Sequence, residues 1–109
     1  MALQSDKSKA ALDDVKLVRA SKRGDTAAFE ELVGRHRDKI YARAFSMMRN
    51  EDEALDLSQE AWIKAWQRLK QFQGDSSFVT WMTRIVINLC LDQLRKQKRH
   101  PDWLMKNQI

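Results

Sequence analysis

Glycine and proline are scarce in this sequence, which has 3 glycines and 1 proline, Pro101, among its 109 residues. Tight turns between short strands usually depend on these two residue types, so their scarcity argues against a protein built from hairpins. Hydrophobic residues make up 43% of the chain and charged residues 32%, a balance typical of soluble globular proteins. The sequence therefore predicts a single all-α domain, a compact bundle of about four helices.

Cysteine and histidine are also rare. Cys90 is the sole cysteine, which excludes an intrachain disulfide, and its apolar neighbours predict a small buried core residue. His36 and His100 lie far apart and lack the spacing of metal ligands. We expect His36, on the apolar face of a helix, to be partly buried and hydrogen-bonded. We predict no metal and no other cofactor.

Long apolar runs and catalytic motifs are missing as well. The uncharged stretch of residues 85–91 is far too short to cross a bilayer, and the polar N-terminus lacks the apolar centre of a signal peptide. We therefore predict a cytoplasmic protein without membrane insertion. The sequence contains no phosphate-binding glycine loop, no GxSxG and no HExxH, and its acidic residues lack the Glu-x-x-His element of ferritin-like sites. An enzyme is not expected.

Charge is abundant and unevenly distributed. The formal net charge is +5 and the pI is about 9.6, which makes a polyanionic partner plausible. Residues 50–60 contain acids and no base, whereas residues 84–99 contain one acid, Asp92, among the bases Arg84, Arg95, Lys96, Lys98 and Arg99. Two oppositely charged segments favour two different partners.

Apolar periodicity and capping residues predict where the helices lie. Residues 1–11 are polar and aperiodic and are predicted to be a flexible leader, followed by a helix over about 12–22. Asp25 is expected to cap the second helix and Asn50, with Glu53, the third. The third helix is predicted to bury Leu55, Ala61, Trp62, Ala65, Trp66, Leu69 and Phe72. Its bases Lys64, Arg68 and Lys70 are explained by the negative end of the helix dipole.

A fourth helix is predicted to begin after the loop QGDSS, capped by Asp75, Ser76 or Ser77, and to reach about Lys98 before Pro101. Its apolar residues Phe78, Trp81, Met82, Ile85, Leu89 and Leu94 point one way. A narrow polar stripe recurs every four residues and is formed by Thr80, Arg84, Asn88, Asp92 and Lys96. Because the flanks of this stripe are apolar, a binding face is favoured over a generic solvent-exposed surface.

The loop and the stripe together suit single-stranded nucleic acid. Cations follow phosphates, and an aromatic wall accepts an unstacked base. The amide of Asn88 has both a donor and an acceptor and so could read a base edge. An equally good alternative is that Asn88 bonds its own helix or a neighbouring loop.

Three segments carry a joint resemblance: DLSQEAWIKAW at residues 56–66, FQGDSSFVTWMTRIVIN at 72–88 and LDQLRKQKR at 91–99. In this order and spacing, with GDTAAFEEL at 24–32, they resemble region 2 of extracytoplasmic-function (ECF) sigma factors of the sigma-70 family. The resemblance implies a helical domain over residues 12–99 that binds the β′ clamp helices of RNA polymerase core. It also implies that the domain recognises and melts the promoter minus-ten element by capturing non-template bases.

Individual residues take roles from this resemblance. Asp56, Gln59 and Glu60 would face the polymerase, and helical spacing places them with Ile63 on one exposed patch, opposite the tryptophans. Trp62, Trp66 and Trp81 would then be core residues. The pocket for a flipped base would be formed by Phe72, Gly74, Asp75 and Ser76, and minus-ten DNA would be contacted by Arg84 and Asn88, with Arg95 and Lys96 on phosphates. Asp92 is assigned no contact, because a carboxylate repels phosphate.

The resemblance also sets the expected limits of the domain. Family members carry a second DNA-binding domain, and we expect residues 100–109 to begin the interdomain linker, with that domain absent. An anti-sigma factor is an expected partner. The alternative function is a protein-interaction module that serves mainly as an anti-sigma target without independent DNA binding, and a basic helix on a membrane surface ranks third.

Overall fold

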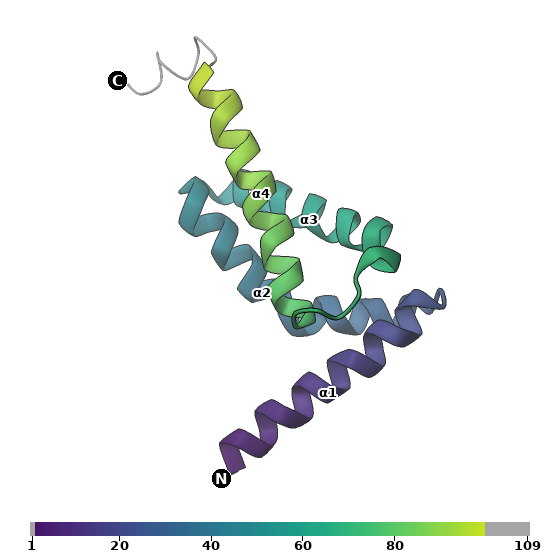
Figure 1. Ribbon diagram of the computed structural model, residues 1–109. Helices are drawn as coiled ribbons and strands as arrows, with labels where there is room; N and C mark the ends of the chain where they lie inside the picture. Colours follow the sequence, from purple (N-terminus) through teal and green to yellow (C-terminus); the bar gives the residue numbers. More distant parts are fainter. Residues whose placement is uncertain (1, 100–109) are drawn as a thin grey trace.

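The chain folds into helices alone within the part that the structure describes. The computed structural model describes the backbone of residues 2–99 and the side chains of residues 12–98. The helices are α1 (Ala2–Lys22), α2 (Thr26–Met48), α3 (Glu51–Arg68), the short 3₁₀ helix η1 (Leu69–Gln71) and α4 (Phe78–Arg99) (Figure 1). The prediction of an all-α bundle of about four helices is confirmed.

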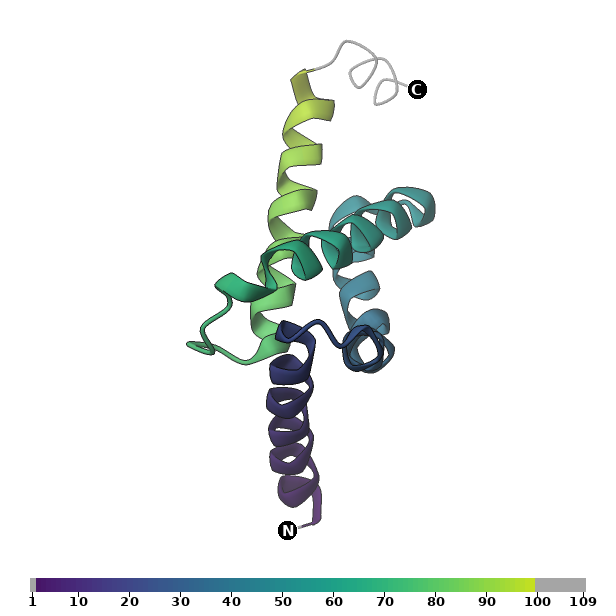
Figure 2. The same cartoon turned by 90° about the vertical axis from the view of Figure 1, so that its right-hand side faces the viewer.

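The helices α2, α3 and α4 form the body of the molecule. In both views α3 crosses α4, whereas α1 and α4 extend from opposite ends of the body (Figures 1 and 2). The loop between η1 and α4 lies close to the end of α1 that leads into α2. Gln97 Nε2 donates a 2.7 Å hydrogen bond to Glu53 Oε1 and so joins the last turns of α4 to the first turn of α3.

Capping residues set the helix starts as the sequence predicts. The side chain of Asp25 accepts a hydrogen bond from Ala28 N at 3.2 Å, and that of Asn50 accepts one from Glu53 N at 2.9 Å. Of the three candidates before α4, Ser77 is the cap, since its Oγ accepts from Thr80 N at 3.2 Å. Each cap satisfies a backbone N–H that has no partner inside its helix.

The first helix is longer than predicted. It begins at Ala2, so the prediction that the helix starts near Leu12 is wrong. Residues 2–11 contain no glycine or proline, and seven of the ten are Ala, Lys, Leu or Gln, whose intrinsic propensity favours a helix even where apolar periodicity is lacking. The predicted linker, residues 100–109, lies outside the described residues.

The core is formed by apolar side chains from all four α-helices. Fully buried members include Leu32, Ile40, Met82, Val86 and Cys90. Aromatic rings fill the end of the core next to the loop, where Phe78 contacts Trp62 and Trp81 with centroids 6.2 and 5.9 Å apart. Such ring pairs add stabilisation beyond the area they bury.

Two predicted core residues of α3 are exposed instead. Leu55 is 48% exposed, and Trp66 is exposed on one side although its ring lies 5.0 Å from that of Phe29. The buried face of α3 follows Ala54, Leu57, Ser58, Ala61, Trp62 and Ala65. At 100° per residue Leu55 lies at the edge of this face, about 20° beyond Trp62 and on the side away from Leu57, and is therefore left half-exposed.

Cys90 provides a simple probe of this core. Burial raises the pKa of its thiol, which keeps the reactive thiolate scarce at neutral pH. We therefore expect alkylation by iodoacetamide to be at least about tenfold slower in the native protein than in urea. Mass spectrometry of quenched samples measures both rates, and equal rates would contradict the buried position.

Candidate nucleic-acid interface

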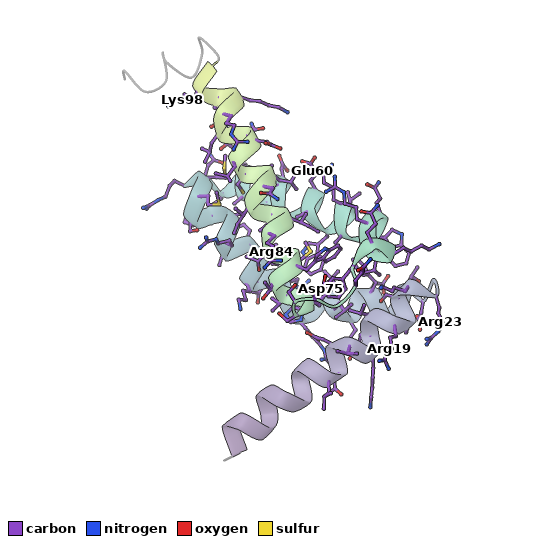
Figure 3. All side chains as sticks on the ribbon, viewed as in Figure 1. Arg19, Arg23, Glu60, Asp75, Arg84 and Lys98 are labelled. Atoms are coloured by element: carbon purple, nitrogen blue, oxygen red, sulfur yellow. The ribbon has the colours of Figure 1, made fainter. Side chains whose placement is uncertain are left out.

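A groove runs between α3 and α4 and contains most of the predicted polar stripe. It has a volume of about 490 Å³, with Leu57, Trp81, Ile85 and Leu89 among its apolar lining residues. All its polar lining residues except Gln93 stand on two facing rows with four-residue steps: Glu60, Lys64 and Arg68 on α3, and Arg84, Asn88, Asp92 and Lys96 on α4. Figure 3 shows Glu60 and Arg84 on these two helices.

Arg84 and Asn88 are available for a ligand in this groove. Both side chains are exposed, and neither has a hydrogen-bond or ion-pair partner among the described residues. The structure therefore contradicts the alternative in which Asn88 bonds its own helix or a neighbouring loop. A guanidinium and an amide one helical turn apart offer donors to phosphate and both donor and acceptor to a base edge.

Two further bases line the same groove and were not predicted to do so. Lys64 and Arg68 were attributed to the helix dipole, an explanation that does not require any particular face. In the structure they follow Glu60 on the side of α3 that meets α4. Their spacing of four residues from Glu60 was the available signal, but the sequence could not show which side of α3 meets α4.

The two last predicted DNA contacts differ in their surroundings. Lys96 lines the groove, whereas Arg95 does not. Arg95 Nη1 instead forms a 3.0 Å ion pair with Asp92 Oδ1 one turn earlier. Exposed pairs of this kind contribute little stability, but the guanidinium offsets the negative charge that Asp92 brings to the stripe.

The loop of residues 72–77 lies apart from the groove. Its Phe72 is only 7% exposed, with its ring centroid 5.0 Å from Trp81 and 6.2 Å from Phe78. The loop turns at Gly74, which has φ of +81°. Gly74, Asp75 and Ser76 line a second hollow of about 790 Å³ against α1, so the structure does not bring them together with Arg84 and Asn88.

His36 is partly buried and has a hydrogen-bond partner, as predicted. Its Nε2 lies 2.8 Å from Asp14 Oδ2, and Arg35 Nη1 donates to Asp14 Oδ1 at 3.2 Å. These contacts join α1 to α2 beside the second hollow. Within the described residues no cluster of potential metal ligands occurs.

The four residues predicted to face polymerase are all exposed on α3: Asp56, Gln59, Glu60 and Ile63. The prediction that this patch lies opposite the tryptophans holds for Trp62, which is buried, and is wrong for the exposed Trp66. Glu60 belongs to the patch and also lines the groove that contains Arg84. The acidic segment therefore meets the basic one at Glu60, whereas Asp56 lies outside the groove.

None of the helices in the described part of the chain has the length and apolar character needed to cross a membrane.

Comparisons with known proteins identify the family. A family model described as Sigma-70 region 2 matches residues 32–100. The ECF RNA polymerase sigma factor SigW of Bacillus subtilis is 37% identical over 94 residues, which cover 86% of this chain and 49% of SigW. The ECF RNA polymerase sigma-E factor of Escherichia coli is 40% identical over 90 residues, covering 83% of this chain and 47% of that protein. The chain thus spans about half the length of these relatives.

A solved structure agrees in fold and in sequence. An NMR structure of an engineered region 2 of sigmaE in complex with GTAAAA is similar to this chain with a TM-score of 0.71 and 36% identity, covering 80% of this chain and 90% of that one. The family match extends over more than half of the sequence and includes α3, the loop and α4. The chain belongs to the Sigma-70 region 2 family and is similar to region 2 of ECF sigma factors.

Proposed function

We propose that this chain is the promoter-recognising part of a transcription initiation factor. It binds RNA polymerase core, at the β′ clamp helices, through the exposed patch on α3. It recognises and melts the minus-ten element by capturing non-template bases. The observation that carries the proposal is the pair of exposed, unpartnered side chains Arg84 and Asn88 in a groove with Lys64, Arg68 and Lys96. The relative of known structure was solved with the oligonucleotide GTAAAA, which supports the same class of ligand.

Selective capture of single-stranded DNA accounts for melting without bond chemistry. Unpairing and unstacking a base costs a few kcal/mol, and a contact with an aromatic wall returns about 1 to 3 kcal/mol per base. Trp81 supplies part of an apolar wall in the groove, and the groove's cations hold the phosphates. The chain accordingly acts as a binding factor and not as an enzyme, and its place of action is the cytoplasm, where the chromosome is.

The buried Phe72 refines this proposal. In the DNA-free chain its ring is packed against Trp81 and Phe78 and offers no open face for stacking. Base capture at Phe72 therefore requires the loop to move, whereas Arg84 and Asn88 are ready to bind. We propose that the groove makes the first contacts and that Gly74, Asp75 and Ser76 close on a base afterwards.

The substitution Asn88→Ala tests base reading. We expect it to lower the preference for a selected single-stranded minus-ten oligonucleotide over its scrambled counterpart by about tenfold, since a good base contact contributes about 1 to 3 kcal/mol of discrimination. Fluorescence anisotropy at one fixed moderate salt concentration measures both affinities. The matched control, Lys96→Ala, should weaken both oligonucleotides alike and reduce the salt slope by about 1. An unchanged preference in Asn88→Ala would reject base reading by this residue.

A second candidate function is a protein-interaction module that serves mainly as an anti-sigma target. Exposed apolar side chains on α3 and α4 favour it: Leu55, Ile63 and Leu91. Such side chains typically anchor protein interfaces. If this were the main function, the chain would bind scrambled and selected DNA equally weakly while still capturing an anti-sigma factor. Under the leading proposal the anti-sigma factor is a further partner.

A further inference from the structure

One lysine at the end of α1 reaches the beginning of the loop that follows η1. Lys22 is the last residue of α1, and its Nζ donates a hydrogen bond to the backbone carbonyl of Phe72. The same Nζ lies 5.8 Å from the centroid of the Phe72 ring, within the range of a cation–π contact. The Lys22 side chain is partly buried between the two segments.

The loop has few other attachments. Its hydrogen bonds are local, from Phe72 N to Leu69 O, from Trp81 N to Ser77 O and among Ser76, Ser77 and Thr80. Apart from the bond to Lys22, no hydrogen bond between described residues joins the loop to α1, α2 or α3. The hollow between the loop and α1 leaves that side of the loop without close packing. Lys22 is therefore the loop's polar tether to the helical body.

This tether is linked by packing to the DNA-binding groove. The Phe72 ring contacts the ring of Trp81, with centroids 5.0 Å apart and planes inclined by 39°. Trp81 in turn lines the groove together with Arg84 and Asn88. Movement of Phe72 therefore shifts Trp81 in the wall of the groove. This can happen although Arg84 and Asn88 themselves are unchanged.

We infer that Lys22 is a positioning residue for base recognition: it holds the Phe72 end of the loop against α1, so that Phe72 keeps Trp81 in place in the wall of the groove while Gly74, Asp75 and Ser76 close on a base. This inference rests on the proposed function and extends it to a helix to which that proposal assigns no role. Lys22 acts through the Phe72 carbonyl and ring rather than by contact with the nucleic acid.

The base that directly follows α1 provides a control for charge. Arg23 is the next residue and is exposed, and it lies where α1 ends (Figure 3). Lys22→Met removes the donor and the charge but keeps the aliphatic stem. Arg23→Met removes the same charge without touching the tether. Lys22→Arg keeps a donor that can reach the carbonyl and serves as the rescue variant.

The experiment uses the full 109-residue chain. The wild type first selects from single-stranded DNA that carries six randomised positions between fixed flanks, and an enriched hexamer becomes the probe. Anisotropy then gives the affinity ratio of the enriched hexamer to its scrambled version for each variant. We expect Lys22→Met to lower this ratio about tenfold, as for loss of a hydrogen bond to a charged group, while Arg23→Met and Lys22→Arg stay within about twofold of wild type.

A second readout separates positioning from general destabilisation. In ¹⁵N relaxation measurements, amides of residues 73–76 in Lys22→Met should show order parameters below about 0.6, while those of α2 and α3 stay near about 0.85. Failure of the wild type to enrich any hexamer would overturn the proposed function and this inference with it. Enrichment by the wild type with an unchanged ratio in Lys22→Met would overturn only the inference. Equal weakening of all sequences by Lys22→Met would also overturn it, because that is the behaviour of a phosphate contact.

Discussion

Reversing the charge of Asp56 is expected to reduce capture of RNA polymerase core by at least about tenfold, because placing like charges together in an interface costs several kcal/mol. Asp56 is exposed at the N-terminal end of the predicted polymerase patch, one turn before Gln59 and Glu60 on α3, and it does not line the DNA groove. In Asp56→Arg the DNA affinity should therefore stay within about twofold of wild type. Pull-down of the tagged chain with purified core, quantified over a concentration series, measures the loss.

The control for this experiment is Glu51→Arg. Glu51 is an exposed acid on the same helix, and five residues of helix place it about 140° away from Asp56. The Glu51→Arg variant should capture polymerase core within about twofold of wild type. Glu60 is a poorer choice for reversal, since it lines the groove and its substitution would alter DNA and polymerase binding together. Capture that is unaffected by Asp56→Arg would exclude this face of α3 as the polymerase site.

Local features of the fold were predictable because their causes are local. Asp25 and Asn50 cap helices through atoms three residues away, and that geometry follows from residue type and order alone. Apolar spacing likewise predicted the burial of Phe78, Met82 and Ile85 on one side of α4. The four-residue stripe on α4 was visible for the same reason, and Arg84 and Asn88 are indeed exposed in one groove.

Features that depend on contacts between distant segments were not predictable from one sequence. The Lys22 donor and the Phe72 carbonyl are 50 residues apart, and no spacing rule relates them. Lys64 and Arg68 looked like helix-dipole partners until the packing of α3 against α4 placed them in the groove. Trp66 was assigned to the core by its helical spacing, yet the α2–α3 contact covers only part of its ring.

The loop of residues 72–77 has one feature that the sequence predicted and one that it could not predict. Its composition correctly indicated a break between two helices, and the chain turns there at Gly74. Its relation to the groove could not be deduced, because the side on which a loop lies depends on the helices that flank it. The structure places the loop against α1, and this arrangement leaves the roles of Gly74, Asp75 and Ser76 in base capture as a proposal that involves loop movement.

Truncation of a buried leucine in the core is expected to cause a large loss of stability. Leu32 on α2 is 0% exposed, and Leu32→Ala should lower the free energy of unfolding by about 2 to 5 kcal/mol through lost transfer energy and the cavity left behind. Natural domains are stable by only about 5 to 15 kcal/mol, so this single change removes a large share of the total. Urea titration followed by far-ultraviolet circular dichroism measures the loss.

Leu12→Ala is the matched control, since Leu12 is 64% exposed on α1 and its truncation should cost no more than about 0.5 kcal/mol. Equal losses in the two variants would contradict the described core.

The core variant Leu32→Ala also differs in its expected effect on binding from the variants at the binding faces. The helix α2 packs on α1, α3 and α4, so unfolding of Leu32→Ala on warming should abolish DNA and polymerase binding together. Asn88→Ala and Asp56→Arg should each lose one activity and keep the other, because their side chains are exposed on different surfaces of an intact bundle.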